Sequence, residues 1–472
     1  MGTDRMLLKN STYYFLPGGT YCSDNPENQK GNDFFVRYTQ RVNLRKSGFA
    51  GRVYSVLSWT TYMILLIGGN AYSQGPGNTN PFHLSAEINI GKTQEANTGF
   101  PETKLQKSAF ISIGWRQQKK DREWAKRLRN PRTGLTFGYT DFGNSESIGY
   151  AISLLPYLEL YPFSKDAQRW RLKTSLGISY LSKEFDSISN PFNRAVSTDY
   201  KWAFRTLLYY DLSKRKKTSW RIGLGYTHNS NGHTRLPNQG LNSLVASIEA
   251  EFMSTKALQE FQPYIKDTAA VKTKERYLTI RTGIGQNVLS EFYNDKKEVY
   301  SFAFSTGKII NSTFKLGIGF FYRFYEHYYD YIDQGEELVE EFYPYFADNP
   351  FVYASNFGVM AEGELLLGHV GAEFGIGLNI YKPAYKIDWQ LNEGDIIFSE
   401  GELVRTLGEL DSYYEIKRSI PTRLGLRWYF ISTRKSPTHN VFIGAHLSAN
   451  FGQADFTELS LGYEYRFRGK KK

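Results

Sequence analysis

Apolar and polar side chains alternate with a period of two along most of the chain after Pro81. In the run 459–467, Leu and aromatic residues alternate with Ser, Gly, Glu and Arg. The run 314–322 repeats the arrangement, with Phe, Leu and Ile on one face and mostly Lys and Gly on the other. A period of two places successive residues on opposite faces of a β-strand. The pattern therefore predicts strands with one apolar and one polar face.

Turn residues separate about sixteen such runs. We predict strands at residues 82–90, 108–116, 133–142, 147–160, 168–181, 201–212, 217–230, 242–252, 276–288, 297–307, 313–325, 353–367, 369–382, 412–432, 439–451 and 456–467. Bacterial outer-membrane barrels have an even number of antiparallel strands, with apolar residues toward lipid and polar residues toward the lumen. The sequence thus predicts an all-β fold, an antiparallel transmembrane β-barrel of about 14 to 16 strands.

The composition supports a barrel over other membrane folds. Aromatic residues make up 16% of the 472 residues, and the mean hydropathy is −0.47. That average excludes a helical membrane protein, whereas a barrel with a polar lumen is hydrophilic overall. In a soluble β-sandwich the apolar face would instead be the core; the length of the runs and the aromatic content favour the barrel.

The N-terminal part of the chain has the pattern of a secretion signal. Basic residues at 41–52 precede an apolar segment at 56–67, and Ala71 and Ser73 form a small-x-small cleavage site. The apolar segment is shorter than the roughly 20 residues that a membrane anchor needs. We therefore predict an N-terminal extension and signal peptide at 1–73 and an outer-membrane barrel at 74–472. The only cysteine, Cys22, lies ahead of the predicted cleavage site.

Polar residues capable of chemistry crowd between the predicted strands 217–230 and 242–252. His228 and Ser230 continue the apolar face of the first strand, and Asn242 is in phase with the apolar face of the second. Residues two apart on a strand share a face and are roughly 6.6 Å apart, so the His228 imidazole can reach the Ser230 hydroxyl. A hairpin pairing would bring Asn242 alongside. Glu249 and Glu251 have the opposite parity.

These residue types form a possible hydrolytic site. Ser230 would be the nucleophile, His228 the base, and Asn242 the group that fixes the imidazole tautomer. Asn231 and Asn238, with backbone amides near Gly232, could donate hydrogen bonds to an oxyanion. A polar connection between strands can also be purely structural. The alignment of His, Ser and Asn with the apolar face favours a site, because unpaired polar groups are costly there.

The motif resembles that of the outer-membrane lipid A 3-O-deacylases (PagL-like or acyloxyacyl hydrolase-like proteins). Their His-x-Ser-Asn sequence corresponds to residues 228–231, and their Asn-x-Gly loop corresponds to Asn238 and Gly240. The resemblance implies a catalytic Ser230 and His228. The family type member has Glu at the position of Asn242, so the resemblance implies either a serine hydrolase with a weaker orienting group or an inactive site.

The remaining expectations concern orientation and partners. From the fifth strand on, long and short connections alternate, and long loops of such barrels face outward; the site then lies at the outer leaflet, toward lipid A of lipopolysaccharide. The stretches 333–341 and 387–411 would be solvated extracellular loops. The net charge of +11 is spread along the chain, which favours an anionic glycolipid over nucleic acid. No metal or other cofactor is implied.

The sequence leaves open one question about function and one about the number of barrels. A passive pore or a structural barrel with a decayed hydrolase motif is the alternative to a lipid A esterase. The half 276–467 could close a second barrel or widen the first. Inward positions are mostly Gly, Ser and Ala with occasional charges, and such residues would fill a narrow lumen poorly. We therefore predict one wide barrel, in which 456–467 pairs with 82–90.

Overall fold

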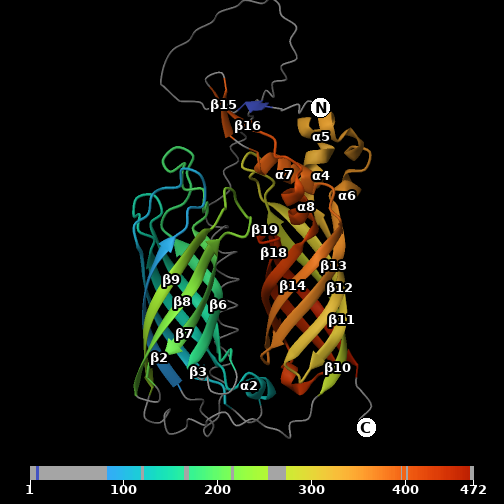
Figure 1. Ribbon diagram of the computed structural model, residues 1–472. Coiled ribbons are helices and arrows are strands. Elements are labelled where there is room, and N and C mark those ends of the chain that lie inside the picture. Colours follow the sequence, from blue (N-terminus) through green and yellow to red (C-terminus); the bar gives the residue numbers. More distant parts are fainter. Residues whose placement is uncertain are drawn as a thin grey trace, which may run out of the picture.

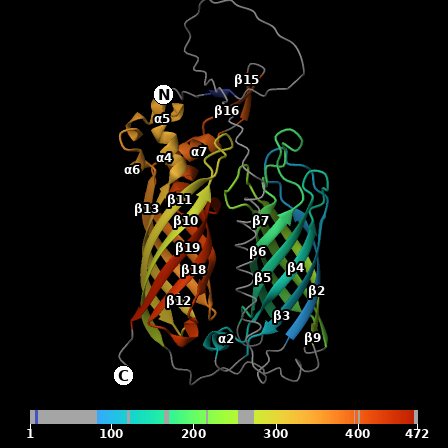
Figure 2. The same ribbon diagram turned by 180° about the vertical axis from the view of Figure 1, so that it is seen from behind.

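The structure, a computed structural model, consists of two closed β-barrels of eight strands each that stand side by side (Figures 1 and 2). It describes residues 7–9, 82–118, 122–163, 169–213, 217–253, 273–394, 396–399 and 402–467. The predicted extension and signal peptide lie outside the described residues, apart from three residues in a short strand. The expected antiparallel, all-β barrel fold is confirmed.

The first barrel is an up-and-down series of antiparallel strands, in which each strand pairs with the next and the last pairs with the first. Its strands are β2 (Phe82–Thr93), β3 (Gln106–Arg116), β4 (Arg132–Asp141), β5 (Tyr150–Leu160), β6 (Trp170–Leu181), β7 (Tyr200–Asp211), β8 (Thr218–Ser230) and β9 (Leu241–Met253).

The second barrel repeats this topology. Its strands are β10 (Lys274–Asn287), β11 (Lys297–Ile310), β12 (Phe314–Tyr325), β13 (Ser355–Leu366), β14 (Val370–Tyr381), β17 (Pro421–Tyr429), β18 (His439–Asn450) and β19 (Gln453–Phe467). Each of the sixteen predicted runs overlaps one strand. The prediction at 412–432 is partly wrong, because α8 (Ser412–Ser419) precedes β17. The Asp411 side chain accepts a hydrogen bond from Tyr414 N and caps that helix. The helix ends just before Pro421, because a proline disfavours the helical conformation of the preceding residue.

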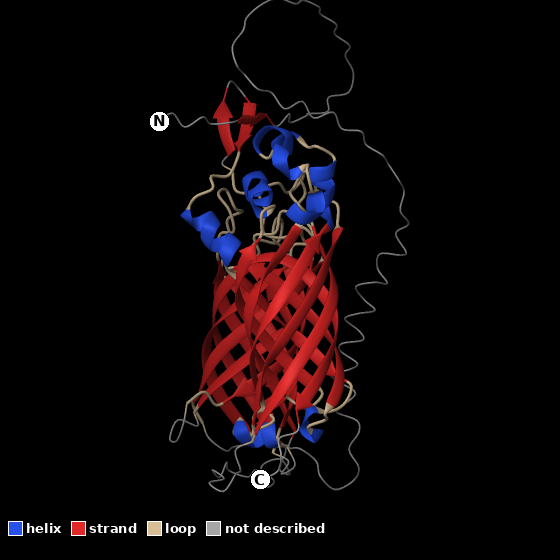
Figure 3. Cartoon of the chain, turned by 90° about the vertical axis from the view of Figure 1, so that its right-hand side faces the viewer, coloured by secondary structure: helices blue, strands red, loops and turns tan. Residues whose placement is uncertain are grey.

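Short helices lie at both ends of the barrels (Figure 3). α2 (Glu123–Arg127) lies at the lower end in Figure 1, and the helices of the β12–β13 and β14–β17 connections lie at the upper end. The upper helices are α4 (Glu326–Asp333), α5 (Glu337–Phe342), η1 (Pro344–Phe346), α6 (Pro350–Tyr353), α7 (Tyr385–Asn392) and α8. η2 (Thr433–Lys435), in the β17–β18 connection, lies at the end opposite to them. β1 (Leu7–Lys9), β16 (Glu402–Thr406) and β15 (Ile396–Ser399) form a separate small sheet. Among the described residues, no helix has the length and apolar character to cross a membrane.

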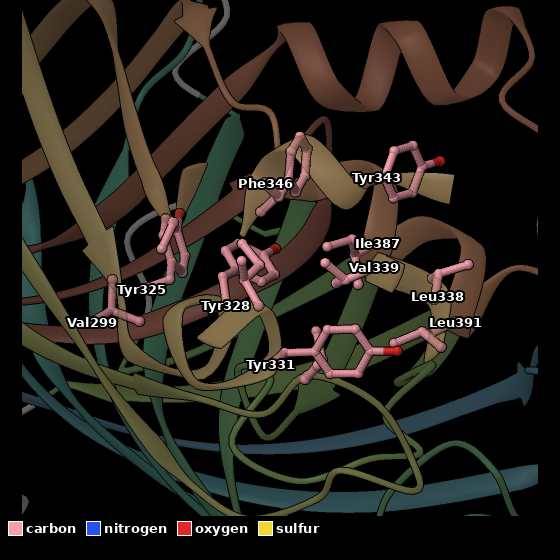
Figure 4. Packing of buried hydrophobic residues seen from close by; sticks show 14 of the residues in the cluster. Val299, Tyr325, Tyr328, Tyr331, Leu338, Val339, Tyr343, Phe346, Ile387 and Leu391 are labelled. Carbon is pink, nitrogen blue, oxygen red and sulfur yellow. The ribbon is translucent and has the colours of Figure 1, made fainter. Parts of the chain in front are cut away.

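The helices at the upper end of the second barrel enclose an apolar cluster (Figure 4). Val339 of α5 and Ile387 of α7 are buried there beside Tyr325 and Tyr328. The prediction that 333–341 and 387–411 are solvated loops is therefore wrong for these parts. Apolar residues interspersed among the acidic ones give α5 one buried face, so the segment packs onto the end of the barrel despite its charge.

The outer faces of both barrels are apolar, as expected for transmembrane strands. Leu224 on β8 and Ile318 on β12 are each 70% exposed, and large apolar residues are exposed along most of the strands. A soluble protein rarely leaves such a continuous apolar surface in water. The two outer surfaces therefore match a lipid environment.

The prediction of one wide barrel is wrong. β2 pairs with β9 in the register Ile88↔Ile248, and β10 pairs with β19 in the register Ile280↔Tyr463, so each half closes on itself. We expected small inward residues to leave a narrow lumen poorly filled, but long side chains lie between the small ones. The largest fully buried side chains include Arg205, Tyr209, Tyr277, Arg423 and Arg427.

Ion pairs fill the two interiors. Arg132 of β4 donates to Glu251 of β9 across the first barrel, with 2.7 Å between Nη2 and Oε1. In the second barrel, Arg423 Nη1 donates to Glu373 Oε1 at 2.7 Å, and His446 Nε2 lies 2.9 Å from Glu373 Oε2. An eight-stranded barrel has an interior just wide enough for side chains to fill. Opposed charges therefore satisfy one another there.

Closure of each barrel predicts which strands can be crosslinked. In a Cys22→Ser background, the pair Ala86→Cys and Ala250→Cys should form a disulfide on oxidation, because these residues face each other across β2 and β9. The matched pair Ala86→Cys and Leu461→Cys should not, because β19 pairs with β10 instead of β2. Electrophoresis without reductant distinguishes the two. Intramolecular crosslinking of the second pair would contradict two closed barrels.

Candidate functional site

The predicted site lies on the outer face of the first barrel, where β8 ends and β9 begins. Antiparallel pairing places His228 directly opposite Asn242 and Ser230 directly opposite Trp202 of β7. Because connections in an up-and-down barrel alternate between its ends, the 231–240 loop lies at the end opposite α2. The structure thus brings the three predicted catalytic residues to one outward-facing end of the barrel.

His228 is held by Asn242. Its Nδ1 lies 2.7 Å from Asn242 Oδ1, and the Tyr226 hydroxyl donates to the same oxygen at 2.5 Å. Because an amide oxygen only accepts, Nδ1 carries the proton and Nε2 is left with a lone pair. That is the tautomer a general base requires. Sequence reasoning missed Tyr226, although it shares the strand parity of His228 and Ser230.

Ser230 follows His228 by two residues on the same outward face. It is 3% exposed, and its Oγ has no hydrogen-bond partner among the described residues. Catalytic hydrogen bonds are often long before substrate binds, so a missing bond to His228 is compatible with a nucleophile. Burial means that neighbouring side chains must move before an ester reaches the oxygen.

The loop after Ser230 is organised by two asparagines. Asn238 Oδ1 accepts from Asn231 N at 2.9 Å. The Asn231 amide group donates to Arg235 O at 2.6 Å, and its Oδ1 accepts from His233 N at 3.0 Å. Asn231 is thus committed to the shape of the loop. Asn238 Nδ2 is buried and has no partner within the described structure, so it is the side-chain donor available to an oxyanion.

Both glycines of the motif occupy positions that a side chain would disturb. Gly232 has φ +67° and Gly240 has φ +79°, in the region that disfavours L-residues with a Cβ. A Cβ on Gly240 would lie 2.8 Å from His228 Cε1. The Gly240 N–H donates to Ala195 O at 2.8 Å, so Gly240 contributes close packing against the imidazole and no free donor.

The acidic residues near the motif point elsewhere, as their parity predicts. Glu249 is paired with Arg221 inside the barrel, with 2.6 Å between Oε1 and Nη2, and Glu251 is paired with Arg132. Neither carboxylate shares the outward face of His228. Across the described part of the chain, no cluster of three or more His, Cys, Asp or Glu residues is arranged to hold a metal ion.

The fold and this constellation define a class: a barrel of transmembrane type with a histidine, a serine and an asparagine on its outer face at one end. Residues 109–251, which run from β3 to β9, match the model of the lipid A 3-O-deacylase (PagL) family. The family resemblance of the motif is therefore confirmed for the first barrel. A search of curated proteins finds no matching relative.

Solved barrels are similar at low identity. The crystal structure of the outer membrane enzyme PagL is 15% identical, covers 35% of this chain and 97% of its own, and has a TM-score of 0.25. A mutant porin of Rhodopseudomonas blastica is 9% identical over 82% of this chain and 99% of its own, with a TM-score of 0.15. CdiB from Acinetobacter baumannii is 8% identical over 82% of this chain and 60% of its own, with a TM-score of 0.15.

The contact between Gly240 and His228 predicts an unequal effect of two glycine substitutions. Gly452 has φ +90° and no heavy atom within 4 Å of a built Cβ, so Gly452→Ala should lower the free energy of unfolding by only the backbone term, about 1–2 kcal/mol. Gly240→Ala should lower it by about 1 kcal/mol more, because the methyl group displaces an imidazole held by Asn242. Urea titration in lipid vesicles measures both. Equal losses would contradict the close packing.

Proposed function

We propose that the first barrel is an outer-membrane serine esterase that removes an ester-linked acyl chain from lipid A of lipopolysaccharide, with Ser230 as nucleophile and His228 as base. The observation that best supports this function is the His228 tautomer fixed by Asn242, two residues from Ser230 on the outward face. It lies within the segment that matches the lipid A 3-O-deacylase family.

The reaction uses side chains alone. Ser230 Oγ attacks the ester carbonyl and its proton passes to His228 Nε2, while Asn238 Nδ2 donates to the oxyanion. Collapse of the tetrahedral intermediate breaks the bond to the alkoxy oxygen of the ester, which takes the proton from His228 and leaves as a hydroxyl group, while the acyl group stays on Ser230 Oγ. Water then attacks the acyl group with His228 again as base. The bond to Ser230 Oγ breaks, the proton on His228 returns to that oxygen, and the free fatty acid leaves.

Asn242 sets the expected efficiency of this chemistry. An amide oxygen holds the imidazole in position, but it carries no charge to stabilise the imidazolium that forms when His228 accepts a proton. The Tyr226 hydroxyl bound to the same oxygen adds orientation without charge. We therefore expect a lower reaction rate than that of an enzyme with a carboxylate at this position.

Location supports the choice of substrate. The apolar outer face of the barrel continues up to the site, where Leu224 and Leu244 are 70% and 59% exposed. Groups on that face meet acyl chains, and we assign this end to the outer leaflet, where lipopolysaccharide lies. The net charge of +11 suits the anionic headgroup.

The alternatives receive unequal support. The side chains of Arg205, Glu87 and Tyr209 are buried together in the first interior, where Glu87 Oε1 binds both partners; an open pore has no room there. A structural barrel with an inactive site is favoured by Asn242 in place of an acid and by the covered Ser230. Enzymatic assay separates it from the esterase.

Ser230→Ala and His228→Ala should each reduce fatty-acid release from lipid A by about 10³-fold or more, because the activated nucleophile is lost. Ser243→Ala is a matched control, because Ser243 lies beside Asn242 but is buried on the inward face of the strand. The activity of this variant should stay near that of the unmodified protein. Mass spectrometry of lipid A measures the release. Full activity in Ser230→Ala would exclude the proposed mechanism.

Substitution of Asn242 tests the orienting group. Asn242→Glu should raise the rate or shift its pH profile, because a carboxylate stabilises the imidazolium. Asn242→Ala should lower the rate by roughly 10²-fold, since His228 loses the bond that fixes its tautomer. The pH dependence of the initial rate is the measurement. A rate for Asn242→Ala equal to that of the unmodified protein would show that Asn242 does not orient His228.

A further inference from the structure

The second barrel reaches into the loop that carries the deacylase motif. Asn294 lies between β10 and β11, and its side chain binds both backbone groups of Leu236 in the 231–240 loop. Asn294 Oδ1 accepts from Leu236 N at 2.9 Å, and Asn294 Nδ2 donates to Leu236 O at 2.7 Å. The segment that matches the lipid A deacylase family ends at residue 251, so Asn294 lies outside it.

A second contact point flanks the nucleophile. Thr457 of β19 accepts from Trp202 Nε1 at 3.2 Å, and Trp202 is directly opposite Ser230 in the β7–β8 ladder. The Thr457 hydroxyl also lies 3.3 Å from Gly232 O, to which it donates. The two barrels are therefore in contact at the site itself.

The bonds to Leu236 are transmitted to the reacting groups through a short stretch of chain. Two residues after Leu236, the Asn238 side chain holds the N–H of Asn231, which directly follows Ser230. Two residues further on, Gly240 packs against the His228 ring. A residue whose N–H and C=O are both bound has two peptide groups fixed, so Asn294 fixes the direction in which the loop approaches Asn238.

The tip of the loop also lies close to the helices of the second barrel. Burial lowers the pKa of His327 in α4 to about 3, and His233 of the loop lies near enough to add to that lowering. By contrast, the ion pair of Arg194 and Glu291 joins the barrels through a different loop, between β6 and β7. Asn294 thus binds the motif loop directly, whereas the Glu291 side chain reaches it only through the β6–β7 loop, in which the Arg194 and Ala195 carbonyls accept from Gln239 N and Gly240 N.

We propose that Asn294 is a positioning residue for the esterase site, so that the second barrel completes the active site of the first. This inference rests on the proposed function. The second barrel has a role in the reaction because an asparagine on one of its loops sets the position of Asn238 and of the peptide after the nucleophile.

The test compares Asn294→Ala with Glu291→Gln in the full chain, reconstituted in vesicles that contain lipopolysaccharide. Asn294→Ala should lower kcat for fatty-acid release about tenfold and leave KM within about twofold, because the loss affects the positioned groups more than substrate binding. Glu291→Gln breaks an ion pair that also joins the barrels, but it leaves in place the Arg194 and Ala195 carbonyls that bind the motif loop. It should leave both constants within about twofold. Circular dichroism and heat-dependent electrophoretic mobility check that both variants fold.

A second measurement does not depend on turnover. In protein labelled with ¹³C-histidine, the His228 ring resonance, assigned by its loss in His228→Gln, should shift in Asn294→Ala and stay unchanged in Glu291→Gln. An unmoved resonance, equal kcat losses in both variants, or a raised KM with unchanged kcat would overturn the positioning role. Continued release by Ser230→Ala would instead overturn the proposed function, and the resonance would then decide the positioning role alone.

Discussion

Opposed charges inside each barrel are the constraint on which the rest of the structure depends. Arg132 and Glu251 meet across the first interior, and Arg423 and Glu373 meet in the second. Removal of one partner of such a pair leaves an uncompensated buried charge, which typically costs about 3–5 kcal/mol. The pairs therefore favour a closure in which inward charges of opposite sign meet, and eight strands provide the narrow interior that allows it.

The filled interiors limit where the candidate site can lie. Since inward positions are occupied by paired charges and tyrosines, a substrate can be bound only on the outer face or at the ends of the strands. His228 and Asn242 lie on that outer face, at an end where apolar residues give way to polar ones. This placement suits a lipid whose ester bond lies between acyl chains and a polar headgroup.

Because the chain forms two barrels, the second barrel contacts the outer face of the first beside the candidate site. Within the first barrel the motif loop is bound by the β6–β7 loop, as in the bond from Gly240 N to Ala195 O. Asn294 and Thr457 of the second barrel bind the backbone of the motif loop as well. Loops have few internal contacts and are mobile for that reason. Contact with a second rigid barrel is one way to hold such a loop in a single conformation.

The sequence by itself determined the strands and the face on which the candidate site lies. Strict alternation fixes which side chains point together, so the shared orientation of His228, Ser230 and Asn242, and the opposite orientation of Glu249, followed from parity alone. Helix α8 was missed because its apolar residues lie among polar ones in a run that we read as continuous with the following strand.

Only the tertiary structure decided that there are two barrels. Alternation says which residues face inward but not which strand pairs with the first, because the same inward set can line one wide lumen or fill two narrow ones. The choice depends on whether long side chains such as Arg205 and Tyr277 find partners across a short distance, and those partners are distant in sequence. The bonds from Asn294 to Leu236 were hidden for the same reason, since they join loops of separate barrels.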